Sequence, residues 1–96
     1  MPSFRVIVAV GRLRPAVDPR DVEPAVAAAA RELAVVEATS VDVVSGEARI
    51  TVRFTEDNAG TALRVAEHTV ARLRTFAEVG AWRLTERVGG RWYRRA

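Results

Sequence analysis

The chain has 96 residues, of which 49% are hydrophobic and 28% charged, a composition typical of a soluble globular protein and not of a disordered one. It contains no cysteine, which excludes disulfides, thiolate nucleophiles and cysteine-ligated zinc or iron–sulfur centres. All fifteen basic residues are arginines, and the formal net charge of +3 permits binding to a polyanion without requiring it.

A chain of this length predicts a single domain over residues 1–96 with a core of modest size. Its N-terminus lacks the basic and apolar segments of a signal peptide. The longest unbroken apolar runs, Val6–Val10 and Pro24–Ala30, are too short to span a bilayer. We therefore expect a cytoplasmic protein with no membrane partner. The exclusive use of arginine and the run of alanines at 27–30 indicate a bacterial source with a GC-rich genome.

The first half of the chain predicts a strand followed by a helix. Residues Phe4–Val10 alternate with period two and are apolar on both faces, which is typical of a central strand. A helical period runs over Val22–Val36, with Asp21 as N-cap and Pro24 in the first turn. The predicted buried stripe of this helix is Val22, Val26, Ala29 and Leu33.

Two further strands are expected at Thr39–Ser45 and Ala48–Thr55, joined by a hairpin turn through Ser45-Gly46-Glu47. A second helix is predicted over Asn58–Val79, with Asp57 as its cap and Gly80 as a left-handed C-terminal cap. Its predicted stripe consists of Leu63, Ala66, Val70, Leu73 and Ala77, with Phe76 beside it.

The last segment reads as a strand that turns back on itself. An alternating run from Trp82 to Val88 is followed by Gly89-Gly90, a strong signal for a two-residue hairpin turn. We therefore expect a short fifth strand over residues 91–95. The directly opposed pairs would be Val88 with Arg91, Arg87 with Trp92, and Glu86 with Tyr93.

The predicted order of elements is strand, helix, strand, strand, helix, strand, which is the plan of the ferredoxin-like fold. We therefore expect an α+β sandwich with an antiparallel sheet of order 4-1-3-2. Both helices should cover one face, and the C-terminal hairpin should extend the sheet. Because this fold hosts enzymes, RNA binders, metal carriers and regulatory modules, it predicts little about function.

The uncovered face of that sheet is the main candidate surface. Its arginines and scarcity of acid make it basic, and its remaining residues make it partly apolar. We expect Trp92 at the rim, with the Arg87 guanidinium stacked on the indole. The residues predicted on this face are Arg5, Ile7, Ala9, Arg49, Thr51, Arg53, Arg83, Thr85, Arg87 and Trp92, with Asp42 and Val44 from the second strand.

Two hypotheses follow for this face. The first is a homodimer that packs sheet against sheet and acts as a ligand-binding or regulatory module. Its ligand would be a small molecule, with Arg12 and Arg14 of the first loop as anion contacts. The second is RNA binding through the arginines. The central strands of RNA-binding sheets carry stacking aromatics, and here they offer only residues such as Arg5, Ile7 and Thr51.

An enzyme is a third alternative. The segment Gly11–Pro15 lies between the first strand and the first helix, where acylphosphatase holds its phosphate, and the chain is similar to that family in length and element order. Only Gly11 and Arg12 match the family's phosphate loop, and Val41–Ser45 lacks its catalytic asparagine. Small dimeric α/β-barrel monooxygenases are also similar in length and topology, although the six aromatic residues here provide little to line a pocket.

No catalytic residue, metal ligand set or cofactor is predicted. His68 is the only histidine, so a histidine-pair metal site cannot form. The carboxylates Asp18, Asp21 and Glu23 crowd the start of the first helix, where capping and the helix dipole account for them. No nucleophile-elbow spacing occurs.

Overall fold

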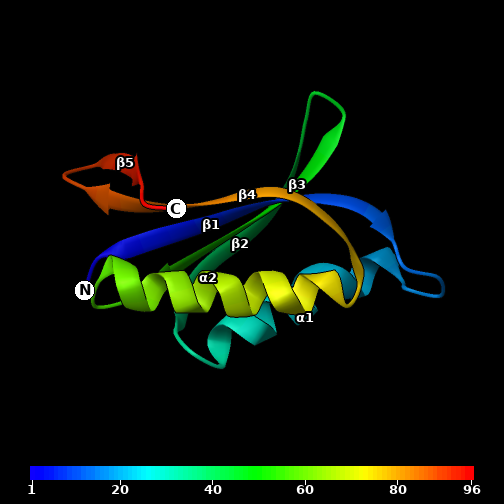
Figure 1. Cartoon of the computed structure of the whole chain (residues 1–96), viewed down its shortest axis with the longest axis horizontal. Coiled ribbons are helices and arrows are strands. Elements are labelled where there is room, and N and C mark those ends of the chain that lie inside the picture. The colour runs from blue at the N-terminus through cyan, green and yellow to red at the C-terminus, as the bar shows by residue number, and fades with distance from the viewer.

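The computed structural model describes all residues 1–96 and contains five strands and two helices. They are β1 (Ser3–Leu13), α1 (Pro19–Arg31), β2 (Val35–Val44), β3 (Glu47–Thr55), α2 (Ala59–Arg74), β4 (Ala77–Val88) and β5 (Arg91–Arg94). Both helices lie against one face of the sheet, and the other face is open (Figure 1). Neither helix has the length and apolarity needed to cross a membrane.

The five strands form one antiparallel sheet in the order β2-β3-β1-β4-β5. The predicted α+β class, with two helices and an antiparallel sheet, is confirmed. Strand β1 lies in the middle and pairs with β3 in unbroken register from Ser3–Thr55 to Val10–Ala48. Its register with β4 shifts twice, between Val8 and Val10 and between Val10 and Leu13.

The core lies between the sheet and the two helices and contains sixteen buried residues. Alternate residues of β1 and β3 point into it because a strand turns successive side chains to opposite faces. The rings of Phe4 and Phe54 are directly opposed on these strands and stack with centroids 6.0 Å apart. The helices contribute small and branched residues, so they approach the sheet closely. Those of α2 are Ala62, Val65, Ala66, Val70 and Leu73.

Both predicted hairpin turns are confirmed. The turns at Ser45-Gly46 and Gly89-Gly90 have positive φ at both central residues, as a tight hairpin turn of this hand requires. The second turn sets the register of β4 and β5, which pairs Val88 with Arg91, Arg87 with Trp92 and Glu86 with Tyr93 as predicted.

The predicted limits of the first helix are wrong at both ends. Asp18, not Asp21, caps α1, because its carboxylate accepts a hydrogen bond of 2.9 Å from the Arg20 amide. The helix ends at Arg31, since the β-branched residues Val35 and Val36 pair with β3 instead. Leu33 therefore lies outside the helix and is 51% exposed, although the sequence placed it in the buried stripe.

The second helix was also predicted too long. Asn58, not Asp57, caps α2 by accepting a hydrogen bond of 3.0 Å from the Thr61 amide. The helix stops at Arg74 because the following residues, from Ala77 on, pair with β1. Gly80 therefore lies in β4 and is not a left-handed cap. A Cβ there would lie 3.2 Å from that of Ala9, so glycine permits the close approach of the two strands.

We expect Leu73→Ala to lower the free energy of unfolding by about 3 kcal/mol, because it leaves a cavity in the core between α2 and the sheet. The matched variant Leu33→Ala removes an exposed leucine and should change it by about 0.5 kcal/mol or less. Urea unfolding measures both. Similar losses in the two variants would contradict the position of Leu33.

Candidate functional site

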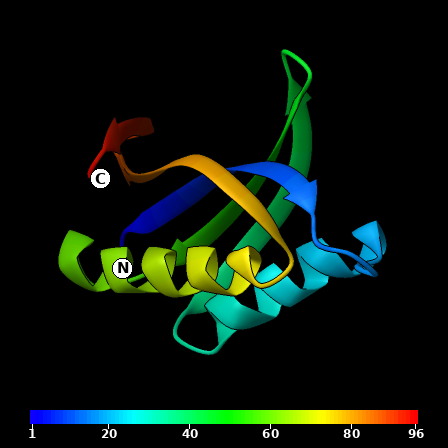
Figure 2. The ribbon, with the colours of Figure 1, turned by 45° about the vertical axis from the view of Figure 1, so that its right-hand side comes forward.

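The open face lies between two raised hairpins. The connected ends of β2 and β3 and the β4–β5 hairpin both rise on the side away from the helices (Figures 1 and 2). Strand register places the predicted residues of β1, β3 and β4 on this face together. We define the open face by Arg5, Ile7, Ala9, Glu37, Ala38, Ser40, Asp42, Glu47, Arg49, Thr51, Arg53, Arg83, Thr85, Arg87, Trp92 and Arg94.

The open face carries the net charge of the whole chain. Six of the fifteen arginines and three of the twelve carboxylates belong to it, so nine of each lie elsewhere and cancel. Of the three carboxylates, Glu47 lies 3.3 Å from Arg49 and Glu37 lies 3.5 Å from Arg53. Arg83 and Arg87 have no ion-pair partner. The positive charge of the face is therefore only partly neutralised.

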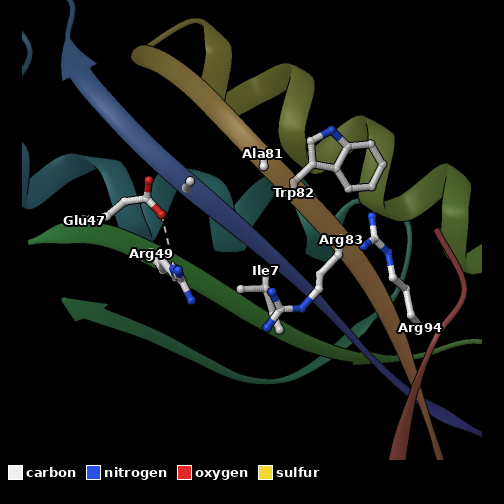
Figure 3. A pocket seen from close by; sticks show the side chains of 8 residues that line it. Ile7, Glu47, Arg49, Ala81, Trp82, Arg83 and Arg94 are labelled. Carbon is white, nitrogen blue, oxygen red and sulfur yellow. Dashed lines mark hydrogen bonds and ion pairs between the residues drawn. The ribbon is translucent and has the colours of Figure 1, made fainter. Parts of the chain in front are cut away.

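Two shallow hollows meet on the open face at Ile7. The smaller, of about 120 Å³, lies between Arg49 on β3 and Arg83 on β4. Figure 3 shows the Arg83 side chain reaching toward Ile7 and that of Arg94 pointing toward Trp82. The larger, of about 360 Å³, extends from Ile7 over β3 to β2 and is lined by Arg5, Ser40, Asp42, Thr51 and Arg53 among others. Neither hollow is enclosed by the aromatic walls of a small-molecule pocket.

Trp92 lies over the face and not at its rim. The Arg5 guanidinium carbon is 3.8 Å from the centroid of the Trp92 ring, and that of Arg53 is 5.4 Å away. The stacking partner predicted from the sequence, Arg87, is wrong, although its pairing with Trp92 across the hairpin is correct. The β4–β5 hairpin rises on the open side of the sheet (Figure 2), and the contact with Arg5 places the indole above β1.

Beneath Trp92, like charges oppose one another across the strands. Arg5 pairs directly with Arg53 on one side and with Thr85 on the other. Opposed like charges destabilise a sheet. Burial lowers the pKa of the Arg5 guanidinium, and the positive charges of Arg53 and Arg87 lower it further. Two donors here, Arg53 Nε and the Thr85 hydroxyl, are buried with no hydrogen-bond partner.

The two arginines predicted as anion contacts in the first loop are not equivalent. Strand β1 extends through Leu13, so Arg12 belongs to the strand. Its side chain is exposed and forms no hydrogen bond or ion pair. Arg14 donates from Nε and Nη2 to the Arg74 carbonyl at 3.3 and 3.1 Å. The Arg14 guanidinium thus pairs a free carbonyl at the C-terminal end of α2, where the helix dipole favours a cation. Only Arg12 is left for a ligand.

His68 belongs to a link between the two helices. Its Nε2 lies 2.8 Å from Oε1 of Glu32 at the end of α1, and Arg72 donates to the same carboxylate at 2.9 Å. The sequence did not indicate this contact, because Glu32 and His68 are 36 residues apart along the chain. No group of three or more His, Asp or Glu side chains is placed to hold a metal ion.

Comparison with known proteins finds no matching family model, no similar curated protein and no similar solved structure. The geometry and charge of the open face therefore carry the functional inference.

We expect Thr85→Val to raise the stability of the free protein by about 1 kcal/mol, because it removes a buried hydroxyl that has no partner. For a domain of this size, the melting temperature should rise by roughly 4–8 °C. The control is Thr69→Val, because the Thr69 hydroxyl is also buried but donates to the Val65 carbonyl at 2.7 Å. This control should not be stabilised. Equal effects in calorimetry would contradict an unsatisfied Thr85.

The link between the helices predicts an acid-dependent loss of stability. Hydrogen bonds from His68 and Arg72 lower the pKa of Glu32. A carboxyl with a lowered folded pKa stabilises the fold above its unfolded pKa, about 4.3, and that contribution is lost as the pH falls through the folded pKa. Glu32→Gln should therefore lower the melting temperature near pH 7. It should have no effect at a pH where Glu32 is protonated in both the folded and the unfolded protein.

The control for that titration is Glu67→Gln on the exposed side of α2, where the carboxylate has no ion-pair partner. Its melting temperature should follow the wild type at every pH. A constant difference between Glu32→Gln and wild type down to about pH 2 would contradict the linkage.

Proposed function

We propose that this protein is a non-catalytic module that binds single-stranded RNA on the open face of its sheet. The observation that carries the proposal is the concentration of the chain's entire net charge on that face. A basic surface concentrates phosphate groups and releases their counterions on binding, which supplies most of the sequence-independent affinity.

The charge favours a polyanion over a second copy of the chain. Packing two open faces together would bring both sets of arginines into one interface, and like charges across an interface cost several kcal/mol, roughly, when they are desolvated. The unpaired Arg83 and Arg87 lie where such packing would bury them. The sheet-face homodimer stays a prediction that competes with RNA for the same surface.

The side chains of the face suit a single strand better than a duplex. Guanidinium planes and the indole of Trp92 offer flat surfaces on which exposed bases stack. The two hollows that meet at Ile7 are shallow, with volumes of about 120 and 360 Å³. Since the central strands carry no aromatic residue on this face, stacking is limited. Most affinity should come from phosphate contacts, so we expect binding in the micromolar range.

We also infer that the chain has the ferredoxin-like plan as one domain over residues 1–96. Read from the β5 edge, the strand order is 5-4-1-3-2, and the run 4-1-3-2 within it supports this plan. The single contiguous core supports one domain. Sheets of this plan that bind RNA do so on the face opposite the helices, which agrees with the position of the charge.

The proposal predicts binding that weakens steeply with salt. In a fluorescence anisotropy titration with single-stranded RNA, Arg49→Ala combined with Arg83→Ala should weaken binding and reduce the salt slope. Two lost phosphate contacts correspond to about 1.4 in the slope. The control, Arg31→Ala combined with Arg64→Ala, changes the net charge equally on the helix side and should bind as the wild type does. Equal weakening in both variants would contradict a site on the open face.

The oligomeric state separates the two uses of the face. Light scattering on a sizing column should give the mass of one chain in both low and high salt. The proposal would be contradicted if the wild type formed a salt-resistant dimer that Ile7→Asp dissociates and did not bind RNA. The face would then be a dimer interface.

A further inference from the structure

One row of the open face differs from the rest in its charge. Arg94, Thr85, Arg5 and Arg53 are directly opposed on four neighbouring strands, β5, β4, β1 and β3. The Arg5 and Arg53 guanidinium groups lie against the Trp92 indole, whereas Arg94 donates from Nε to the Ala96 carbonyl at 3.2 Å and points toward Trp82 (Figure 3). The next row along β1 contains Ile7, Thr51 and Arg83, with a single charge.

Two donors of this row have no hydrogen-bond partner. The Thr85 residue is 8% exposed and its hydroxyl has no partner, and Arg53 Nε is buried without a hydrogen bond. The nearest carboxylate, Glu37, lies 3.5 Å from Arg53 Nε and already accepts a hydrogen bond of 2.7 Å from Ser3. Buried donors in native proteins are nearly always paired. An anion placed among Arg5, Arg53 and Thr85 would pair them.

The row lies at the end of the face, not in the middle. The β4–β5 hairpin and Trp92 cover it from above, and the carboxylate of Glu37 stands beside Arg53 at the Ser3 end. A nucleic-acid chain continuing in that direction would meet this negative charge. In the other direction, the larger hollow opens over Ile7 and Thr51. A strand lying in the hollow would therefore end at the row.

We infer that this row is a phosphomonoester site, which takes the terminal phosphate of the bound strand. The choice of the strand as the source rests on the proposed function. A terminal phosphate carries nearly two negative charges at neutral pH, whereas an internal phosphodiester carries one. It also offers three acceptor oxygens, which match the fork of donors on guanidinium groups and a hydroxyl donor.

The test compares two RNA strands of the same sequence, both with a 3′ fluorophore. One bears a 5′-phosphate and the other a 5′-hydroxyl. An unlabelled strand with a 3′-phosphate, used as competitor, tests the other end. We expect one terminal phosphate to strengthen binding at least about tenfold, as new charge-assisted hydrogen bonds do. Thr85→Val should abolish this preference and still bind the 5′-hydroxyl strand. Thr69→Val, the matched control, should keep the preference.

The outcomes separate this inference from the proposed function. Equal affinity for strands with and without a terminal phosphate overturns the phosphomonoester site and leaves RNA binding intact. If no strand binds, an NMR titration with adenosine monophosphate decides. Shifts at the Arg5 and Thr85 amides that Thr85→Val removes would support the site while the proposed function fails. No shifts there overturn both.

Discussion

The pairing of β1 between β3 and β4 is the constraint on which the rest of this structure depends. The two sides of that strand contact different parts of the molecule, since successive residues point to opposite faces. On one side Phe4 stacks on Phe54 and closes the core against the helices. On the other, Arg5 stands beside Arg53 and Thr85. A shift of one residue in register would exchange the two sides, so the core and the charged face are specified together.

The C-terminal hairpin converts this charged face into a site. The Gly89-Gly90 turn reverses the chain, and the Arg87–Trp92 pair then places the indole on the open side. The cation–π contact between Trp92 and Arg5 offsets part of the cost of holding Arg5 next to Arg53. Without the hairpin, the two opposed arginines would be open to water, and no end of the face would be closed.

The polar groups beneath Trp92 distinguish the face from a simple charged surface. Elsewhere in the molecule the buried Thr69 hydroxyl donates to the Val65 carbonyl, and the exposed Glu32 carboxylate contacts both His68 and Arg72. Here the Thr85 hydroxyl and Arg53 Nε have no hydrogen bond, and the only carboxylate close to Arg53 Nε is that of Glu37 at 3.5 Å. Such unsatisfied donors cost stability in the free protein, and an anionic ligand would recover that free energy on binding. Function and stability therefore oppose each other at this place.

The alternation of apolar residues by itself determined the number and order of the strands and the open-face residues of β1 and β4, and the glycines at 46, 89 and 90 determined the two tight turns, because a period of two and a glycine in a turn act locally. The ends of the helices were decided only by tertiary structure. Val35 and Ala77 fit a helical period, yet both pair with neighbouring strands, a choice that depends on partners distant in the sequence. The same holds for the closed end of the face. The stacking of Trp92 on Arg5 depends on how the β4–β5 hairpin rises on the open side of the sheet, and sequence spacing does not encode that position.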